Sequence, residues 1–302
     1  MTFRHRCFAG LAVAAMVASW GCGAKEKNDA AKGSTAKKTT NAILVEGSDT
    51  MVNLAQAWAE TYHKEHPEIS VPVLGGGSGV GIASLIDGKC DLANASRKMS
   101  DKEIKKATDN RGAEPVEHIV GYDALAIYVH KDNPLASISM EQLAEIYGKG
   151  GELTEWSQLG VAADAKIAGK IIRVSRQSSS GTYVFFREHI LGTKRDYKQG
   201  SIDENGSKDV VALVSKTPSA IGYSGMGYKT DDVKTLTVSA KTGGPAVAPT
   251  LENAKAGTYP ITRPLQIYSV GPPTGIIKDY LDWIKLPAGQ KVVVEMGYVP
   301  VQ

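Results

Sequence analysis

From residue 42 onward, short apolar segments alternate with segments whose apolar residues follow helical spacing, and this alternation limits the fold more than any other feature. Residues 43–45 and 92–95 are apolar runs of strand length. Between 51 and 62, apolar residues recur three and four positions apart, as on one face of a helix. Strands that alternate with helices favour an α/β fold with mostly parallel sheets and right-handed crossovers. We therefore predict an α/β protein.

The same reading continues to the end of the chain. We expect strands at 43–45, 69–73, 92–95, 120–129, 171–174, 220–223, near 236 and at 266–270, and helices at 51–62, 82–86, after 100, 143–147, 181–191, 211–214 and 277–284. Since no segment repeats another, the sequence does not predict a solenoid.

Length and composition are those of a packed protein. A chain of 302 residues is long enough for about two domains. Its 42% hydrophobic and 22% charged residues exclude a wholly disordered chain. No apolar run reaches the roughly 18 residues of a membrane span, which excludes a polytopic membrane protein.

The first 41 residues have the composition of a targeting segment and a linker. Arg4 and Arg6 precede an apolar stretch of secretory length, residues 7–18, which leads into residues 19–21 and Cys22. Small residues before a cysteine at this position are typical of a bacterial lipoprotein signal, so we expect 1–22 to be cleaved before a lipidated Cys22. An ordinary cleaved signal with an incidental cysteine is the alternative. Residues 23–41, rich in Ala, Lys and Thr, predict a flexible tether.

The net charge of +3 comes from this leading segment. Seven of the 35 basic residues and two of the 32 acidic residues precede residue 42, so the remaining body carries −2. A slightly acidic body argues against a general nucleic-acid binder. Because Cys90 is the one cysteine of the body, we expect no internal disulfide, and a buried, inert thiol.

Three loops with the same chemistry follow predicted strands and precede predicted helices. They are residues 47–50 (Gly-Ser-Asp-Thr), 75–79 (Gly-Gly-Gly-Ser-Gly) and 178–182 (Ser-Ser-Ser-Gly-Thr). Ligands of open α/β sheets bind beyond the carboxyl ends of the strands, where helix N-termini offer unpaired N–H groups and a partial positive charge. Such loops suit a small oxyanion. Each loop taken alone also fits ordinary helix capping.

Competing motifs fail on particular residues. The glycine loop at 75–81 lacks the Lys-Ser/Thr of a nucleotide P-loop and the glycine spacing of a dinucleotide fold. The stretch 222–226 misses the last glycine of a nucleophile elbow. His63 and His66 lie on one helix face without a third ligand, as on a solvated helix. The sequence therefore predicts no catalytic residue, no metal site and no cofactor.

Two arginines lie near the ends of predicted strands. Arg97 follows the strand at 92–95, and Arg176 precedes the third loop. A guanidinium group matches the geometry of a tetrahedral oxyanion and stays charged. A surface ion pair is the ordinary alternative for each, and Arg97 also has Asp123 as a possible partner.

Seven stretches of the sequence resemble those of a known protein family. Residues 47–50, 75–82, 91–97, 121–126, 176–182, 221–223 and 259–265 resemble, in order, the phosphate-binding proteins of bacterial phosphate ABC transporters, the PstS family. The resemblance implies a type II periplasmic-binding-protein fold. Two lobes, each a mostly parallel sheet flanked by helices, would close on the ligand in a cleft. We expect the crossovers near Ala126 and Ser224, which places 42–125 and 224–302 in lobe I and 126–223 in lobe II.

The resemblance also implies the ligand contacts. The expected phosphate-binding residues are Ser48, Asp49, Thr50, Ser78, Gly79, Ser96, Arg97, Arg176, Ser180, Gly181 and Thr182. Some family members have an aspartate at the position of Arg97, and that aspartate accepts the phosphate proton. Asp49 is our candidate for that role, and the alternative is that Asp49 only complements the helix dipole.

The implied function is capture of inorganic phosphate and its delivery to an ABC permease, without catalysis. The protein would be a monomer outside the cytoplasm, in the periplasm or on the outer cell surface, held to the membrane by the lipid (palmitate) on Cys22. A receptor for sulfate, molybdate or tungstate would use the same helix ends. A sensory or scavenging role without a permease, and a phosphatase-like enzyme, are further alternatives.

Overall fold

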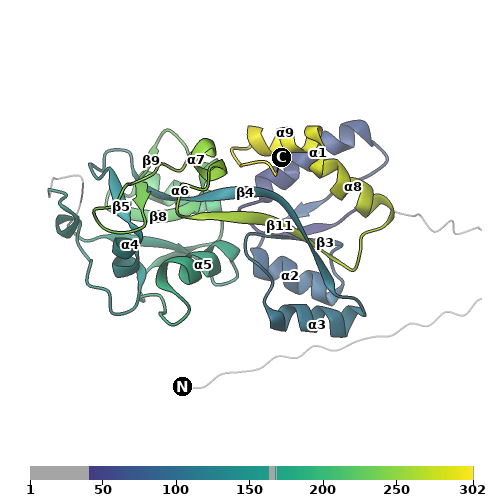
Figure 1. Cartoon of the computed structure of the whole chain (residues 1–302), viewed down its shortest axis with the longest axis horizontal. Helices are drawn as coiled ribbons and strands as arrows, with labels where there is room; N and C mark the ends of the chain where they lie inside the picture. Colours follow the sequence, from purple (N-terminus) through teal and green to yellow (C-terminus); the bar gives the residue numbers. More distant parts are fainter. Residues whose placement is uncertain (1–40, 163–166, 168, 302) are drawn as a thin grey trace, which may run out of the picture. The chain divides into compact units, whose positions relative to one another are not determined.

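The computed structural model describes residues 41–162, 167 and 169–301 (Figure 1). The expected signal peptide, the lipidated Cys22 and the tether up to residue 40 lie outside these residues. Among the described residues, no helix is both long enough and apolar enough to cross a bilayer.

The first lobe contains three short strands and five helices. The strands are β1 Val45–Gly47, β2 Val73–Leu74 and β3 Leu92–Ala95. The helices are α1 Val52–Glu65, α2 Ser78–Asp87, α3 Asp101–Arg111, α8 Gly275–Lys285 and α9 Pro287–Glu295. The expected helices at 51–62 and 82–86 are confirmed, as is capping by Ser100, whose hydroxyl accepts a hydrogen bond from the Glu103 amide. The sequence did not predict α9.

The second lobe contains the remaining short elements. Its strands are β5 Ser137–Ser139, β6 Ile172–Arg176, β7 Ile202–Glu204, β8 Ala220–Gly225, β9 Val233–Thr235 and β10 Thr237–Ser239. Its α-helices are α4 Met140–Tyr147, α5 Gly181–Phe186, α6 Ser207–Lys216 and α7 Leu251–Lys255. One π turn, Arg187–Leu191, extends α5 to Gly192, where the sequence predicts the end of the helix. Two 3-10 turns, Trp156–Leu159 and Met226–Tyr228, complete the lobe.

Two long strands join the lobes. β4 Pro115–His130 and β11 Thr262–Val270 run antiparallel to each other and cross from one lobe to the other (Figure 1). The strand order is β2-β1-β3-β11-β4-β8-β6-β7, with β9 also paired to β4. The outer pairs, β1 with β2 and β3, and β6 with β7 and β8, are parallel, whereas β4 and β11 pair antiparallel with their neighbours. The carboxyl ends of the parallel strands of both lobes therefore lie toward the boundary between the lobes.

The second crossing lies later in the chain than the sequence suggested. We expected it near Ser224, but Ser224 lies inside β8, which pairs with β4. The following strands remain in the second lobe, because β9 pairs with β4 and β10 pairs with β5. Tyr259 and Ile261 pack in the same core as Trp156 and Phe186. In our description the second lobe therefore extends to about Ile261, and β11 begins the return to the first.

Each lobe has its own core. In the first lobe, Trp58 and Tyr62 of α1 pack with Tyr280 and Trp283 of α8, and the Trp58 indole donates to the Gly289 carbonyl in α9 at 2.8 Å. In the second lobe, the rings of Phe186 and Tyr223 stack with centroids 3.9 Å apart. These separate cores allow each lobe to present its loops on a rigid support.

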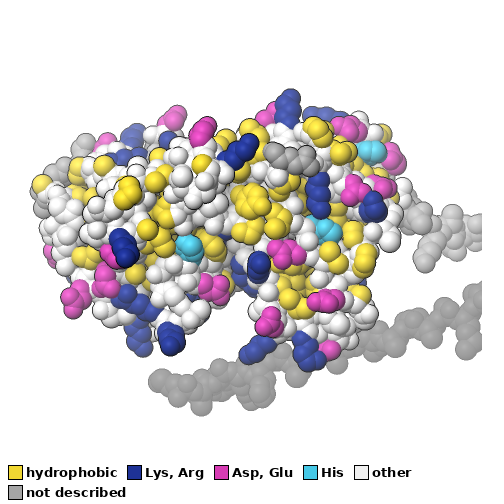
Figure 2. All heavy atoms as spheres, viewed as in Figure 1, with side chains coloured by type: hydrophobic (Ala, Val, Ile, Leu, Met, Phe, Trp, Pro, Cys, Tyr) yellow, Lys and Arg dark blue, Asp and Glu magenta, His cyan; other side chains and the backbone are white. Residues whose placement is uncertain are grey.

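One face of the molecule is mixed in charge. On the face shown in Figure 2, Lys/Arg and Asp/Glu side chains are interspersed and form no extended patch of one sign. Cys90 is buried and free, which confirms the expected burial of this cysteine. Burial raises the pKa of its thiol to about 12, as is typical of an unreactive thiol.

Candidate functional site

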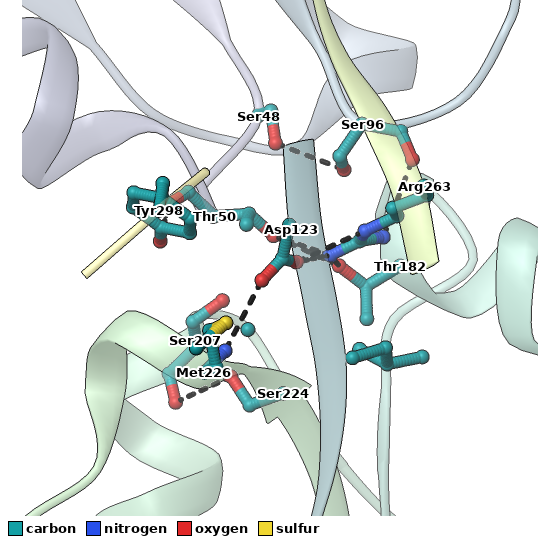
Figure 3. Close-up of polar contacts among 12 residues, drawn as sticks. Ser48, Thr50, Ser96, Asp123, Thr182, Ser207, Ser224, Met226, Arg263 and Tyr298 are labelled. Carbon is teal, nitrogen blue, oxygen red and sulfur yellow. Dashed lines mark hydrogen bonds and ion pairs between the residues drawn. The ribbon is translucent and has the colours of Figure 1, made fainter. Parts of the chain in front are cut away.

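Serine hydroxyls from three loops of the first lobe meet beside the crossing strands. The Ser48 hydroxyl donates to Ser96 Oγ at 3.0 Å (Figure 3). Ser78 Oγ lies 3.4 Å from Ser96 Oγ. The Ser96 amide donates to Ser78 Oγ at 3.0 Å. All three side chains are buried, with at most 2% of their surface exposed. All three serines are among the phosphate-binding residues expected from the family resemblance.

The third loop brings the second lobe to the same place. Thr182 Oγ1 lies 2.9 Å from Thr50 Oγ1 of the first lobe, and both threonines are buried. A β-carbon on Gly181 would lie 2.3 Å from Ser78 Oγ, so the backbone of this loop touches the serine cluster directly. We call Ser48, Thr50, Ser78, Ser96 and Thr182 the hydroxyl cluster.

Helix capping does not explain most of these hydroxyls. The residue before α1 is Met51 and the residue before α2 is Gly77, and neither helix start has a side-chain cap. Gly77 has φ +96°, and a β-carbon there would lie 2.7 Å from the Ser179 carbonyl of the other lobe, so only glycine fits. Ser180, which is not part of the hydroxyl cluster, does cap a helix: its hydroxyl accepts a hydrogen bond from the Thr182 amide at the start of α5.

Arg263 lies at the centre of the cluster. Its Nε and Nη2 donate to Asp123 Oδ2 at 3.1 and 2.9 Å. The same Nη2 reaches Thr50 Oγ1 at 3.2 Å and Thr182 Oγ1 at 3.0 Å, and Nη1 reaches the Ser96 carbonyl at 3.2 Å (Figure 3). One guanidinium therefore contacts both lobes and both crossing strands. Arg263 was not among the site residues predicted from the sequence, although it lies in residues 259–265, which carry the family resemblance.

Arg176 is the second buried guanidinium. Its Nη2 donates to Asp49 Oδ2 at 3.0 Å and to the Asn205 carbonyl at 2.7 Å, and its Nη1 donates to Ser207 Oγ at 3.0 Å. Its buried Nε has no hydrogen-bond partner among the described residues. Burial lowers the pKa of Arg176 from its usual value, and the nearby Asp49 opposes that shift.

Arg97 does not pair with Asp123, so that expectation is wrong. Its guanidinium donates to both carboxylate oxygens of Glu103, at 2.7 and 2.8 Å, and to the Lys98 carbonyl at 2.9 Å. Glu103 is the third residue of α3 and lies close to the end of β3, whereas Asp123 is already occupied by Arg263. Arg97 Nε is buried and, like Arg176 Nε, unpartnered in the described part of the chain.

Asp49 bonds away from the hydroxyl cluster. Its Oδ1 accepts the Gly76 amide at 2.9 Å and its Oδ2 accepts Arg176. Among the described residues, its carboxylate forms no hydrogen bond with any cluster hydroxyl. It lines instead a cavity of about 270 Å³ between the lobes, together with Asn53, Ser207 and Tyr228.

The remaining expected site residue, Gly79, contacts the opposite lobe. Its amide donates to the Ser179 carbonyl at 2.9 Å, which joins the second and third loops. No group of three or more His, Cys, Asp or Glu side chains in the described ranges is placed to hold a metal ion. The site that the structure assembles is thus a buried set of hydroxyls, backbone N–H groups and arginines.

Comparison with known proteins shows to which family this chain belongs. The model of a periplasmic-binding-protein (PBP) superfamily domain matches residues 32–285. The chain is 37% identical to a phosphate-binding protein PstS of Pseudomonas aeruginosa over 84% of this chain and 81% of the relative. It is 32% identical to the protein of the same name from Bacillus subtilis, over 96% of this chain and 90% of the relative.

Solved structures agree. A phosphate ABC transporter substrate-binding protein from Clostridium perfringens, solved with bound phosphate, superposes with a TM-score of 0.76 at 26% identity, over 86% of this chain and all of that chain. An ABC-type phosphate transport receptor from Vibrio cholerae gives a TM-score of 0.66 at 28% identity, over 85% and 99%. The chain therefore belongs to the PstS family of phosphate-binding proteins, within the periplasmic-binding-protein superfamily.

Proposed function

We propose that this protein captures inorganic phosphate and delivers it to an ABC-type phosphate permease. The observation that carries the proposal is the hydroxyl cluster, where buried donors from both lobes converge around Arg263. Hydroxyls, helix-start amides and guanidinium groups are all hydrogen-bond donors, and a small tetrahedral oxyanion is their common acceptor. The family relationship supports phosphate as that anion.

The charges around the cluster balance in pairs. Arg263 pairs with Asp123, Arg176 with Asp49, and Arg97 with Glu103. A bound anion is therefore held by directed hydrogen bonds and not by an uncompensated positive field. Buried donors without partners cost free energy, and the free Nε groups of Arg97 and Arg176 would recover it by bonding an anion.

The proposed ligand set keeps most of the sequence expectation and adds one residue. We propose that phosphate is bound by Ser48, Thr50, Ser78, Ser96, Arg97, Arg176, Ser180, Gly181, Thr182 and Arg263. Gly79 and Asp49 are proposed to join the lobes, because the amide of the first and the carboxylate of the second are already bonded to protein groups.

The cellular setting is part of the proposal. Residues 1–22 would direct export, Cys22 would carry the lipid (palmitate) anchor, and the tether would hold the binding domain outside the cytoplasm near its permease. A monomer is proposed, because the ligand groups come from the two lobes of one chain. Export and lipidation are tested by mass spectrometry of the protein from membranes, in which Cys22→Ser should lose the lipid mass.

Calorimetry tests the function directly. The purified protein, dialysed free of phosphate, is titrated with phosphate, sulfate and molybdate. Several charge-assisted hydrogen bonds, at about 1.5–3 kcal/mol each, are enough for the roughly 8 kcal/mol of micromolar binding after ordering costs. We expect micromolar or tighter binding of phosphate, and weaker binding of sulfate and molybdate.

Other results of the titrations would support one of the alternative functions. Tighter binding of sulfate or molybdate would make the protein a receptor for that oxyanion, and turnover of a phosphoester by the same sample would revive an enzyme. The matched control is Lys131→Gln, which removes a surface cation paired with Asp232 and should leave all three titrations unchanged.

A further inference from the structure

An ion pair joins the two lobes outside the hydroxyl cluster. Asp49 belongs to the first loop of the first lobe, and Arg176 is the last residue of β6 in the second lobe. Their side chains meet at 3.0 Å, with Arg176 fully buried and 18% of the Asp49 side chain exposed. This contact links residues that are 127 positions apart, and it joins the two lobes without a ligand between them.

Both members of the pair are held in place by other groups. Within the first lobe, the Gly76 amide fixes Asp49 Oδ1 at 2.9 Å. The Tyr228 hydroxyl of the second lobe donates to the Asp49 backbone carbonyl at 2.6 Å, which adds a second contact between the lobes. Arg176 is held by Ser207 and Asn205 of its own lobe. Because the side chains are already oriented within each lobe, little conformational entropy is lost when the lobes meet.

The pair has its own solvent access. The cavity of about 270 Å³ beside it is lined by Asp49, Asn53 and Gly75 from the first lobe and by Ser207 and Lys208 from the second. Opening the lobes would separate these walls and break the ion pair. The ion pair therefore forms only when the lobes are closed. No hydrogen bond links the Asp49 carboxylate to the described cluster hydroxyls.

We propose that Asp49 is a positioning residue that latches the lobes through Arg176, and that it does not accept the ligand's proton. The proposal rests on the proposed function, since it concerns closure over the same anion site. Only the closed form brings donors of both lobes to one ion, so apparent affinity is proportional to the closed fraction of the free protein. The latch raises that fraction.

This role makes a prediction that a proton acceptor does not share. Weakening the latch lowers the closed fraction before any ligand binds, so affinity for every anion falls by the same factor. Loss of a proton acceptor instead removes a contact made only with a protonated anion, which changes the phosphate-to-sulfate ratio. The latch is also partly exposed, so added salt screens it.

The test variant is Asp49→Asn with Asp209→Asn as its matched control. The asparagine side chain keeps an oxygen for the Gly76 amide but loses the charge that attracts Arg176. Asp209 lines the same cavity, and its carboxylate accepts the Gly206 amide, a bond that an asparagine oxygen can keep. In calorimetry of the full chain we expect the phosphate dissociation constant to rise roughly five- to tenfold in Asp49→Asn and less than twofold in Asp209→Asn. The phosphate-to-sulfate ratio should stay within about twofold of wild type.

Amide hydrogen exchange provides a second readout in phosphate-free buffer. The Gly79 amide bonds to the Ser179 carbonyl of the other lobe, so its protection follows closure. In Asp49→Asn, exchange at Gly79 should accelerate, because the open fraction of the free protein rises. Amides of β11, paired with β4 inside the sheet, should keep their protection, because the fold itself is intact.

The results separate the two proposals. If wild type does not bind phosphate, the proposed function fails, whatever Asp49 does to exchange at Gly79. If wild type binds phosphate and Asp49→Asn has unchanged affinity and unchanged Gly79 exchange, the latch is wrong. A changed phosphate-to-sulfate ratio in Asp49→Asn also overturns the latch, since it places Asp49 on the ligand.

Discussion

At the scale of single residues, the site is governed by the cost of burying charge. Arg263 and Asp123 are 1% and 0% exposed, and a guanidinium or carboxylate at such depth is stable only with a hydrogen-bonded partner. Asp123 meets this requirement with Arg263 and with the Met226 amide at 3.1 Å. The pair is separated by 140 positions in the sequence, which is why sequence reasoning did not connect them. The signal in the sequence was an aspartate inside the mainly apolar run of residues 120–129.

Replacing Arg263 should affect binding and stability by separable amounts. Arg263→Met keeps the apolar stem but leaves Asp123 buried and unpaired, which should lower the free energy of unfolding by about 3–5 kcal/mol. Because charge-assisted hydrogen bonds to the anion are also lost, the dissociation constant for phosphate should rise at least tenfold. Urea denaturation without phosphate and calorimetry measure the two effects.

A double variant distinguishes the two roles of Arg263. Arg263→Met combined with Asp123→Asn removes the unpaired charge and should regain much of the lost stability without regaining phosphate affinity. If the double variant binds phosphate as tightly as wild type, Arg263 is a structural partner of Asp123 alone and leaves the ligand set.

At the scale of elements, the strand-to-helix loops were predictable and their partners were not. Glycine and hydroxyl residues between β1 and α1, β2 and α2, and β6 and α5 mark anion-binding helix starts by local sequence alone. Long-range pairing decides the rest. We expected one crossing near Ala126, which lies inside β4, but the sequence did not predict that β11 is the second crossing strand. Nor did it predict that β9 and β10 keep residues 233–239 in the second lobe.

The close packing of α2 on β1 is tested by Gly81→Ala. A β-carbon on Gly81 would lie 2.3 Å from the Glu46 carbonyl oxygen and 2.5 Å from Gly47 Cα. Alanine improves helix propensity by up to about 1 kcal/mol, but overpacking against backbone costs about 1–3 kcal/mol, so the clash should win. Urea denaturation should show a net loss of stability. Ser84→Ala, on the same helix, is the control, and a more stable Gly81→Ala would contradict the packing.

The pairing of β4 with β11 contains a group that responds to pH. His118 of β4 is buried and hydrogen-bonds Ser269 of β11 at 3.0 Å. Burial, with a smaller effect of Lys285, lowers its pKa below the usual 6.5, while Asp282 partly opposes the shift. The unfolded chain therefore takes up a proton first as pH falls. Stability from this group is complete above about pH 6.5 and decreases below it, by at most about 1.4 kcal/mol per pH unit.

Chemical denaturation between pH 7.5 and 5.5 measures this effect. Other groups also titrate in that range, so the comparison is with His118→Gln, which keeps a side chain able to hydrogen-bond Ser269 but cannot be protonated. The variant should lose less stability than wild type on acidification. Equal losses in the two proteins would show that His118 does not contribute.

At the scale of the whole molecule, binding and closure are one equilibrium. The hydroxyl cluster takes residues from both lobes, and Arg263 contacts both through Thr50 and Thr182. An anion that bonds all of these groups must favour the closed form over any form in which the lobes are apart. The overall charge contributes little, because the body carries −2 and each buried arginine of the site has a carboxylate partner. Shape and donor placement must therefore determine affinity.

Gly181→Ala tests whether closure itself is required. A β-carbon at Gly181 would lie 2.3 Å from Ser78 Oγ and 2.8 Å from Ser96 Oγ, so the lobes cannot meet without displacing the hydroxyl cluster. Gly181 is the first residue of α5, where alanine is well tolerated within the lobe. Each lobe should fold normally while phosphate binding falls more than a hundredfold.

Unfolding in the presence and absence of phosphate separates these effects. At one hundred times the dissociation constant, phosphate should stabilise wild type by about 2.7 kcal/mol. The same concentration should not stabilise Gly181→Ala, whose stability without phosphate should remain within about 0.5 kcal/mol of wild type. Ser178→Ala removes an exposed hydroxyl from the same loop and should behave as wild type. Full stabilisation of Gly181→Ala by phosphate would mean that the anion binds without contact between Gly181 and the serine cluster, and closure over phosphate would then need another geometry.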